Sequence, residues 1–142
     1  MNITCNNKKE LIIERIVYNP DDIYAFDITK YLNLFKIRMN KDINNITDLG
    51  LEFDVAVNER NILQQLHSLY LKLQELGFMQ FKMLGNLAIV NLDKIKNISY
   101  DNDYCSVDID FEGKSCFYKL GKDKFEEFKD KLQEYKNSTI NL

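Results

Sequence analysis

The residues with the clearest chemical potential are carboxylates gathered in one short stretch, namely Asp101, Asp103, Asp108, Asp110 and Glu112. Asp108 and Asp110 are two positions apart in an expected strand, so they share one face at about 6.6 Å, from about 3.3 Å per residue. Such a pair could serve as acid and base, but nothing in the sequence indicates a pocket that would separate their pKa values. A calcium-binding loop needs ligands at alternate positions, a central glycine and a closing glutamate, and the run from Asp101 to Cys105 breaks that pattern early.

Two interpretations of the acidic stretch remain. In the first, it is a solvated strand face that lies opposite an apolar one. In the second, it is an anionic surface for a basic partner, to which Glu52 and Asp54 contribute if their strand adjoins it. The second interpretation gives a candidate partner-binding face made of Asp108, Asp110, Glu52 and Asp54.

Nucleophilic, metal-dependent and nucleotide-dependent chemistry all lack their usual sequence signals. His67 is the single histidine, and no serine or cysteine has the context of a nucleophile elbow. The three cysteines show no C-x-x-C spacing, and the five glycines stand at loops, turns or helix boundaries, without a phosphate-binding loop. We therefore expect no enzyme, no cofactor and no metal; an enzyme would need a deep pocket enclosing His67 and two carboxylates.

The composition is that of an ordinary globular chain of 142 residues, with 45% apolar and 29% charged residues, and it fits a single domain over residues 1–142. The formal net charge of −3 gives no general attraction to phosphate backbones or anionic membranes. The first ten residues are polar, and no apolar run approaches the roughly 20 residues that span a bilayer. Together with the odd number of cysteines, this predicts a cytoplasmic protein.

Extended segments are expected to dominate the first half of the chain. Hydrophobic runs and alternation predict strands at Leu11–Tyr18, Ile23–Ile28, Leu32–Met39 and Leu51–Val57. The run Asn19-Pro20-Asp21-Asp22 is a turn signal, and the polar residues 41–49 predict a loop. Glu52 and Asp54 lie on the polar side of the last of these strands.

Two amphipathic helices are expected, at Glu59–Leu76 and Lys122–Tyr135. Asn58 is the expected N-cap of the first helix, and Gly77 follows it as the C′ residue. Strands between the two helices are predicted at Phe78–Leu84, Leu87–Asn91, Ile95–Tyr100, Tyr104–Phe111 and Ser115–Leu120.

Tight turns are expected at Gly85-Asn86 and at Glu112-Gly113. With the second as a two-residue turn, Ile109 faces Cys116, Val107 faces Tyr118 and Cys105 faces Leu120, all on one apolar face. The sulfurs of Cys105 and Cys116 would then lie about 13 Å apart, too far for a disulfide, so free thiols are expected.

The predicted fold is α+β, with antiparallel β-meanders packed against two amphipathic helices. Each half of the chain is a run of strands closed by a helix, but the residues of the two halves do not match closely enough to establish a repeat. No linker rich in Pro, Gly or Ser divides them.

The segment FKMLGNLAIVNLDKIKNI, residues 81–98, resembles the central segment of LytTR-type DNA-binding domains. In that family a strand of the form F-x-R-x-H-R-S-x-x-V-N-L-x-x-I-x-x-I follows a short helix, and a hairpin and a last helix come after it. The resemblance covers about residues 58–132. The matching scaffold positions are Phe81, Ile89, Val90, Asn91, Leu92, Ile95 and Ile98.

The resemblance implies a transcriptional regulator, but the departures from the family fall on its DNA-contacting positions. Those positions hold Met83, Gly85, Asn86 and Leu87 here, and Gly121-Lys122 replaces a Ser-Arg pair. Under this interpretation, DNA would be contacted by Lys82, Asn86, Lys122 and Lys124.

The leading functional hypothesis is a non-catalytic protein that binds and occupies a macromolecular partner through the acidic face. Small acidic proteins rich in Asn and Lys include the inhibitors and immunity proteins carried by phages and mobile elements. The partner would be a protein with a basic surface. The alternative is a divergent LytTR-like regulator that binds DNA.

Overall fold

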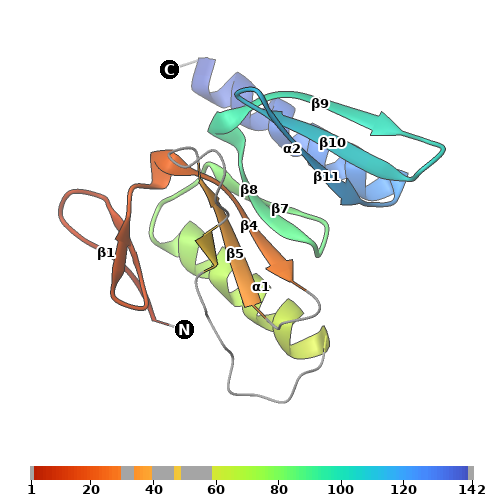
Figure 1. Cartoon of the computed structure of the whole chain (residues 1–142). Coiled ribbons are helices and arrows are strands. Elements are labelled where there is room, and N and C mark those ends of the chain that lie inside the picture. The colour runs from red at the N-terminus through yellow and green to blue at the C-terminus, as the bar shows by residue number, and fades with distance from the viewer. Residues whose placement is uncertain (1, 30–33, 40–46, 49–58, 141–142) are drawn as a thin grey trace.

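The computed structural model describes residues 2–29, 34–39, 47–48 and 59–140 (Figure 1). The fold is α+β, as the sequence pattern predicts. Its helices are α1 (Glu59–Glu75) and α2 (Lys122–Ile140), and two 3₁₀ turns are η1 (Pro20–Asp22) and η2 (Leu92–Lys94). The strands are β1 (Ile3–Cys5), β2 (Leu11–Ile13), β3 (Ile16–Tyr18), β4 (Ile23–Thr29), β5 (Leu34–Met39), β6 (Thr47–Asp48), β7 (Phe81–Leu84), β8 (Ala88–Asn91), β9 (Ile95–Asp101), β10 (Ser106–Phe111) and β11 (Lys114–Lys119).

Within the described residues the strands form three antiparallel sheets. Their strand orders are β1-β2-β3, β6-β5-β4-β8-β7 and β11-β10-β9. The central sheet is completed by a long-range pairing, in which Ala25, Phe26 and Asp27 of β4 face Val90, Ile89 and Ala88 of β8. The hairpin β7–β8 therefore extends a sheet begun more than sixty residues earlier, as residue numbers 25 and 90 make plain.

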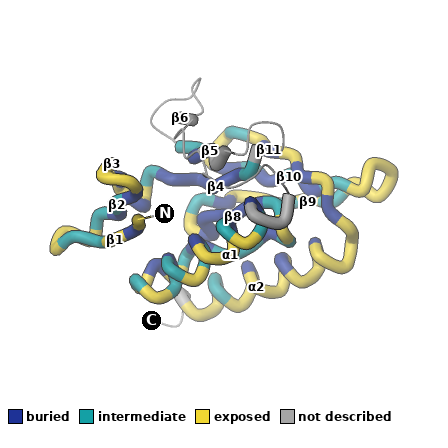
Figure 2. The backbone as a smooth tube through the Cα atoms, turned by 90° about the horizontal axis from the view of Figure 1, so that it is seen from below, coloured by how far each residue is buried: buried dark blue, intermediate teal, exposed yellow. Residues whose placement is uncertain are grey.

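The hydrophobic core lies in two clusters on opposite faces of the central sheet. The first joins α1 and the hairpin β2–β3 to the face that carries Phe26, Ile37 and Ile89. The second joins α2 and the β9–β10–β11 sheet to the face that carries Ala25 and Val90. Figure 2 shows the result, with buried strands in the middle of the molecule and exposed residues along the outer side of α2. All four residues of β8 are buried because both of its faces are covered.

Helix α1 ends at Glu75, one residue before the predicted Leu76, and Gly77 is its C′ residue as predicted. Gly77 has a φ of 92°, its N–H donates to the carbonyl of Gln74, and the N–H of Phe78 donates to the carbonyl of Leu73. This is the Schellman motif, in which a glycine in the left-handed region satisfies the last carbonyls of a helix. Phe78, buried next in sequence, anchors the chain as it enters β7.

Asn91 ties the two corners of the chain together. Its side chain is fully buried, and Nδ2 donates to the carbonyls of Ile23 (2.8 Å) and Pro20 (3.3 Å) at the η1 corner. Its Oδ1 accepts from the N–H of Asp93 (3.0 Å) and so caps η2. One amide thus satisfies three backbone groups on two segments that are distant in sequence.

A second polar group connects the central sheet to β11. The carboxylate of Asp27, buried on β4, accepts from the hydroxyl of Tyr118 (2.8 Å) and from Nε of Arg38 on β5. Burial disfavours the charged guanidinium, but the Asp27 carboxylate outweighs burial, and the pKa of Arg38 is raised. Burial and Asp27 raise the pKa of Tyr118 well above its usual value, so the phenol stays a hydrogen-bond donor.

The N-terminal third differs from the expected strands. The expected strand at 11–18 is the hairpin β2–β3, which turns at Glu14 and Arg15 with φ values of 48° and 73°. These φ values are those of a type I′ turn, which no sequence signal indicates here because neither residue is Gly or Asn. Strand β1 was not expected either, since its three residues are flanked by polar ones.

Two details of the expected hairpins are also corrected. Leu84 pairs with Ala88, so the loop after β7 has three residues, Gly85–Leu87, instead of two. Cys105 lies exposed in the turn before β10 with a φ of 48°, so it does not share the apolar face with Val107 and Ile109. The expected register of β10 and β11 is confirmed, as Ile109 faces Cys116 and Val107 faces Tyr118.

The expected strand at 51–57 and its N-cap neighbour Asn58 lie outside the described residues. The expected loop at 41–49 lies outside them too, except for β6, which pairs with β5 through Thr47 and Asp48. Helix α1 begins at Glu59, as predicted, and α2 extends to Ile140, five residues beyond the predicted Tyr135.

Replacing Asn91 by Ala should lower the free energy of unfolding by about 3 kcal/mol, because the carbonyls of Ile23 and Pro20 each lose a hydrogen bond from a buried donor and η2 loses its cap. Asn19 is the matched control, since it caps η1 by one bond from the N–H of Asp21 but is exposed. Its replacement by Ala should cost about 1 kcal/mol. Urea denaturation of the two variants measures the difference, and equal losses would contradict the role assigned to Asn91.

Candidate functional site

Of the carboxylates singled out in the sequence, Asp101, Asp108 and Asp110 lie on the outer face of the β9–β10–β11 sheet, and Asp103 and Glu112 lie in its two turns. Along β10, Val107, Ile109 and Phe111 are buried toward α2, and Asp108 and Asp110 alternate with them on the opposite face. Paired residues of neighbouring strands share a face, so the ladder defines the whole surface. We call this the outer face; it consists of Asn97, Ser99, Asp101, Ser106, Asp108, Asp110, Ser115, Phe117 and Lys119.

Two of these carboxylates shape their own turns. Asp110 accepts from the N–H of Gly113 (2.9 Å) and so fixes the Glu112-Gly113 turn. Asp101 accepts from the N–H groups of Asp103 (2.9 Å) and Tyr104 (3.3 Å) in the turn between β9 and β10. Local hydrogen bonds of this kind explain why aspartates occur at both ends of the hairpin.

Asp108 differs from the other carboxylates of the outer face. Its Oδ1 atom is buried and has no hydrogen-bond partner among the described residues. Its neighbours across the ladder are Ser99 on β9 and Phe117 on β11. Phe117 is 71% exposed, which is unusual for a phenylalanine in the middle of a strand. An unsatisfied carboxylate therefore lies beside a bare aromatic ring.

A shallow hollow of about 450 Å³ adjoins this pair. Asp108 and Phe117 form one side of it, and the turn at Asp101–Asp103 forms the other. Three carboxylates and the rings of Tyr100 and Phe117 line the hollow beside small polar residues, so a cationic group with an apolar stem fits it best.

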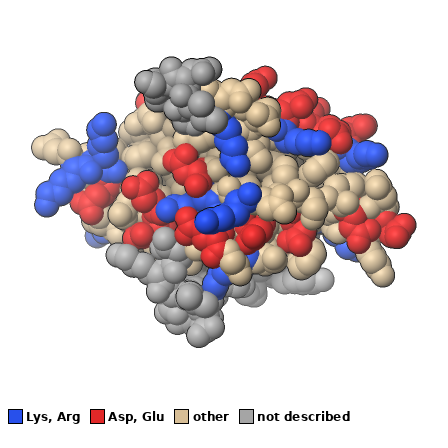
Figure 3. Space-filling model, turned by 90° about the horizontal axis from the view of Figure 1, so that it is seen from above, with Lys and Arg blue, Asp and Glu red and all other residues tan. Residues whose placement is uncertain are grey.

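The rest of the predicted anionic surface is less coherent. Glu52 and Asp54 lie outside the described residues. Glu112 lies 3.7 Å from Nζ of Lys94, and Lys119 belongs to the outer face itself. Acidic and basic side chains are also interspersed over the face shown in the space-filling view (Figure 3). Recognition by the outer face would therefore depend on local geometry at Asp108 and Phe117.

The four residues of the DNA-binding interpretation come from neighbouring elements. Leu120, just before α2, lies against the turn that holds Asn86, since a Cβ at Gly85 would be 2.6 Å from the Leu120 side chain. Lys122 and Lys124 are exposed in the first turn of α2, where Lys124 lies 3.5 Å from Glu127. Lys82 on β7 donates to Gln74 (2.8 Å), and burial and the nearby Lys131 lower its pKa.

The structure contains two features that sequence reasoning missed. The first is the buried group of Asp27, Arg38 and Tyr118; an aspartate inside the apolar run of β4 was its only signal. The second is a cleft of about 860 Å³ beside the η1 corner, bordered by the 5–10 loop and the end of α1. Its lining mixes Lys8 and Lys9 with Glu10 and Asp21, so it concentrates no single chemistry.

Other reactive groups lie apart from the outer face. His67 is exposed on α1, with its ring centroid 6.4 Å from that of Tyr70. Cys5, Cys105 and Cys116 are free, and burial raises the pKa of Cys116. In the part of the chain that the structure describes, no three His, Cys, Asp or Glu side chains gather closely enough to hold a metal ion.

Neither described helix has the length and apolar composition needed to cross a bilayer. No protein-family model matches this chain, and comparison with curated proteins and with solved structures gave no significant match.

Replacement of Asp110 by Ala should lower the free energy of unfolding by about 1 kcal/mol, because the Gly113 N–H loses its acceptor. The same replacement at Asp108 should change it by less than about 0.5 kcal/mol or raise it, because Oδ1 has no partner to lose. Urea denaturation compares the two variants on one strand. A larger loss at Asp108 than at Asp110 would show that Asp108 serves stability and not binding.

Proposed function

We propose that this protein is a non-catalytic binding protein that occupies a macromolecular partner through the outer face of the β9–β10–β11 sheet. The partner is a protein that presents a basic side chain beside an apolar one. This mode of action is that of an inhibitor or immunity-type protein, as phages and mobile elements carry.

The observation that carries this proposal is the pairing of Asp108 with Phe117. A buried carboxylate oxygen without a donor costs free energy, and an exposed phenylalanine contributes little to folding. Both costs are removed when a Lys or Arg side chain binds Asp108 and lies with its aliphatic stem or guanidinium over the Phe117 ring. The two residues are adjacent in the ladder, so one partner side chain reaches both.

The surroundings of this pair suit a protein partner. Tyr104, 74% exposed in the neighbouring turn, adds a second aromatic contact at the rim. Aromatic residues surrounded by small polar ones are typical of protein interfaces. We place the protein in the cytoplasm, where its three free thiols stay reduced.

A double substitution, Asp108→Lys with Phe117→Ser, tests this function. The unmodified chain and the variant are each used as bait for affinity capture from cells that produce the protein, and captured proteins are quantified. The expected result is a partner bound by the unmodified chain and reduced at least tenfold with the variant, since a buried charged contact contributes about 2 kcal/mol or more.

The matched control is Asp130→Lys, which makes the same charge change at an exposed position on α2. It should leave capture unchanged. Capture that survives the double substitution, or that falls equally with the control, would contradict a role for Asp108 and Phe117.

A second candidate function is DNA binding by a divergent LytTR-like regulator. The observation in its favour is that the turn holding Asn86 packs against Leu120, next to Lys122 at the start of α2. The mixed charges of α2 weaken it, because Lys124 pairs with Glu127 and Asp123 follows Lys122.

Fluorescence anisotropy with mixed duplex DNA at about 50 and 200 mM salt tests this candidate, because phosphate contacts weaken steeply with salt. A DNA-binding protein should bind at the lower salt and lose binding with Lys122→Glu. Our leading proposal predicts no binding at either salt, and salt-sensitive binding lost with Lys122→Glu would favour the regulator instead.

A further inference from the structure

The chain contains the same supersecondary unit twice. The first unit runs through β2, β3, η1, β4, β5, β6 and α1, and the second runs through β7, β8, η2, β9, β10, β11 and α2. Each is a hairpin, a 3₁₀ corner, a three-stranded meander and a helix, in that order.

The two corners agree in backbone detail. Asn19 and Asn91 both have a φ of −81°, with ψ values of 118° and 107°, and both accept from the N–H two residues on. The residues that close the corners, Ile23 and Ile95, each donate an N–H back to the first residue of the 3₁₀ turn.

The strands after the corners share an irregularity. In the first unit Ile23 pairs with Met39, but Ala25 pairs with Arg38, so one residue bulges out of β4. In the second unit Ile95 pairs with Phe111, but Asn97 pairs with Asp110, so β9 bulges at the corresponding place. Bulges are specific local features, and here they occur at the same position after each corner. When the two units are aligned on the corners and bulges, Phe26 corresponds to Ile98 and Val17 corresponds to Ile89.

Inside the molecule, the hairpin of the second unit completes the sheet of the first. β8 pairs with β4, and Phe26 faces Ile89. Among the described residues, the corresponding edges at the two ends are unpaired, since β3 is bonded only to β2 and β9 only to β10. One molecule therefore has the hairpin β2–β3 with no meander paired to it at one end. At the other end the meander β9–β10–β11 has no hairpin paired to it.

The free edge of β3 is chemically suited to pairing. Val17 is 51% exposed and Ile16 is 49% exposed, whereas Ile89, which corresponds to Val17, is fully buried. The pair that closes a two-residue turn is hydrogen-bonded, so the next pair, Ile12 and Val17, is not. The backbone N–H and C=O of Val17 therefore point to the open edge.

The free edge of β9 offers the complementary surface. Ile98 is half-buried against the second core cluster, and its counterpart Phe26 is fully buried under Ile89 and α1. Asn91 binds the carbonyls of Pro20 and Ile23. In the second unit the corresponding carbonyls belong to Leu92 and Ile95. Asn19 is exposed and uses only its Oδ1 in the bonds found, so its amide group can serve them.

We propose that β3 of one molecule pairs with β9 of a second copy of this chain and repeats the internal contact between β8 and β4. In this register Tyr18 faces Asn97, Val17 faces Ile98 and Ile16 faces Ser99. The two three-stranded sheets merge into one of six strands, ordered β11-β10-β9-β3-β2-β1. Val17 covers Ile98, and Asn19 donates to the carbonyls of Leu92 and Ile95.

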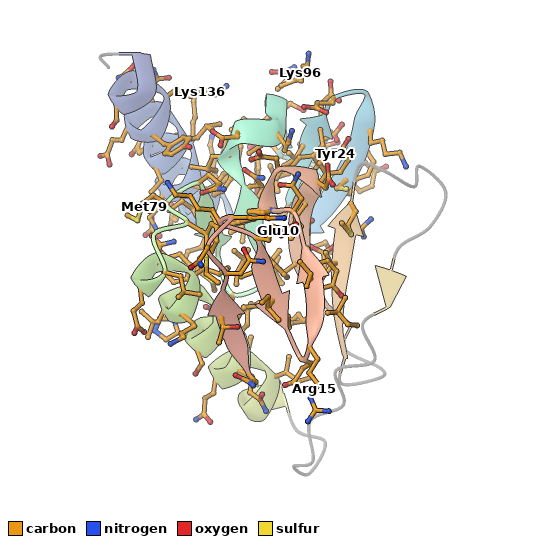
Figure 4. All side chains as sticks on the ribbon, turned by 90° about the vertical axis from the view of Figure 1, so that its left-hand side faces the viewer. Glu10, Arg15, Tyr24, Met79, Lys96 and Lys136 are labelled. Carbon is orange, nitrogen blue, oxygen red and sulfur yellow. The ribbon has the colours of Figure 1, made fainter. Side chains whose placement is uncertain are left out.

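The two edges lie at opposite ends of the molecule, so a chain does not satisfy both by itself. Arg15, at the tip of the β2–β3 hairpin, and Lys96, on β9, lie at opposite ends of the view in Figure 4. The contact is head-to-tail, and such contacts build rings or open filaments instead of symmetric dimers. This inference does not depend on the proposed function, because Asp108 and Phe117 lie on the face of the sheet and not on its edge.

Sedimentation of the full chain over about 5 to 500 µM tests the proposal by mass action. The weight-average mass should rise above that of the monomer. Val17→Pro removes an N–H that faces the open edge and blocks the donor strand, and Ile98→Pro does the same on the acceptor strand. Each variant alone should stay monomeric, whereas an equimolar mixture should form a dimer, because one good edge of each kind remains.

Three further variants keep the test decisive. Leu71 on α1 is 53% exposed, so Leu71→Lys removes an equally exposed apolar side chain away from both edges and should leave association intact. If a proline variant does not fold, the exposed positions Val17 and Asn97 take lysine instead, which blunts a strand edge. A monomer at every concentration, association that neither edge variant reduces, or a mixture without dimer would each overturn the proposal.

Discussion

The pairing of β4 with β8 is the contact on which the rest of this fold depends. It turns a three-stranded meander and a separate hairpin into a sheet of five strands with two covered faces. α1 packs on one face and α2, with its own meander, packs on the other. Without this pairing neither helix would have a complete sheet face to pack on. The two core clusters would then not lie on opposite faces of one continuous sheet.

Buried polar groups make that pairing specific. Asn91 lies at the end of β8 and satisfies backbone groups of both corners, so the hairpin cannot slide along β4 without leaving carbonyls unpaired. Asp27 makes the packing of the β9–β10–β11 sheet on the central sheet specific in a similar way. Its carboxylate binds Arg38 of the central sheet and Tyr118 of β11. Apolar packing supplies the driving force here, and these few polar contacts select one register.

Much of the fold could be predicted from the sequence, because regular elements have local signals. The helical spacing of apolar residues predicted both helices. Gly77 indicated the end of α1, and the Glu112-Gly113 turn predicted the register of β10 and β11. The hairpin β2–β3 had no such signal, since Glu14 and Arg15 occupy positive φ through context and not through type. The candidate site was predictable only in part. Alternation along β10 predicted that Asp108 and Asp110 point outward. Their different roles were not predictable, because Asp110 bonds the Gly113 N–H and Asp108 lies beside the exposed Phe117 ring of β11.

The long-range pairing between residues 25–27 and 88–90 has a consequence for synthesis on the ribosome. The first meander emerges early, yet the edge of β4 stays unpaired until β8 has been made, and the face toward the second core cluster stays uncovered until α2 follows. Closing so long a loop is slow compared with forming either hairpin. A nascent chain therefore carries an exposed, apolar strand edge for much of its translation, which is the kind of segment that chaperones bind.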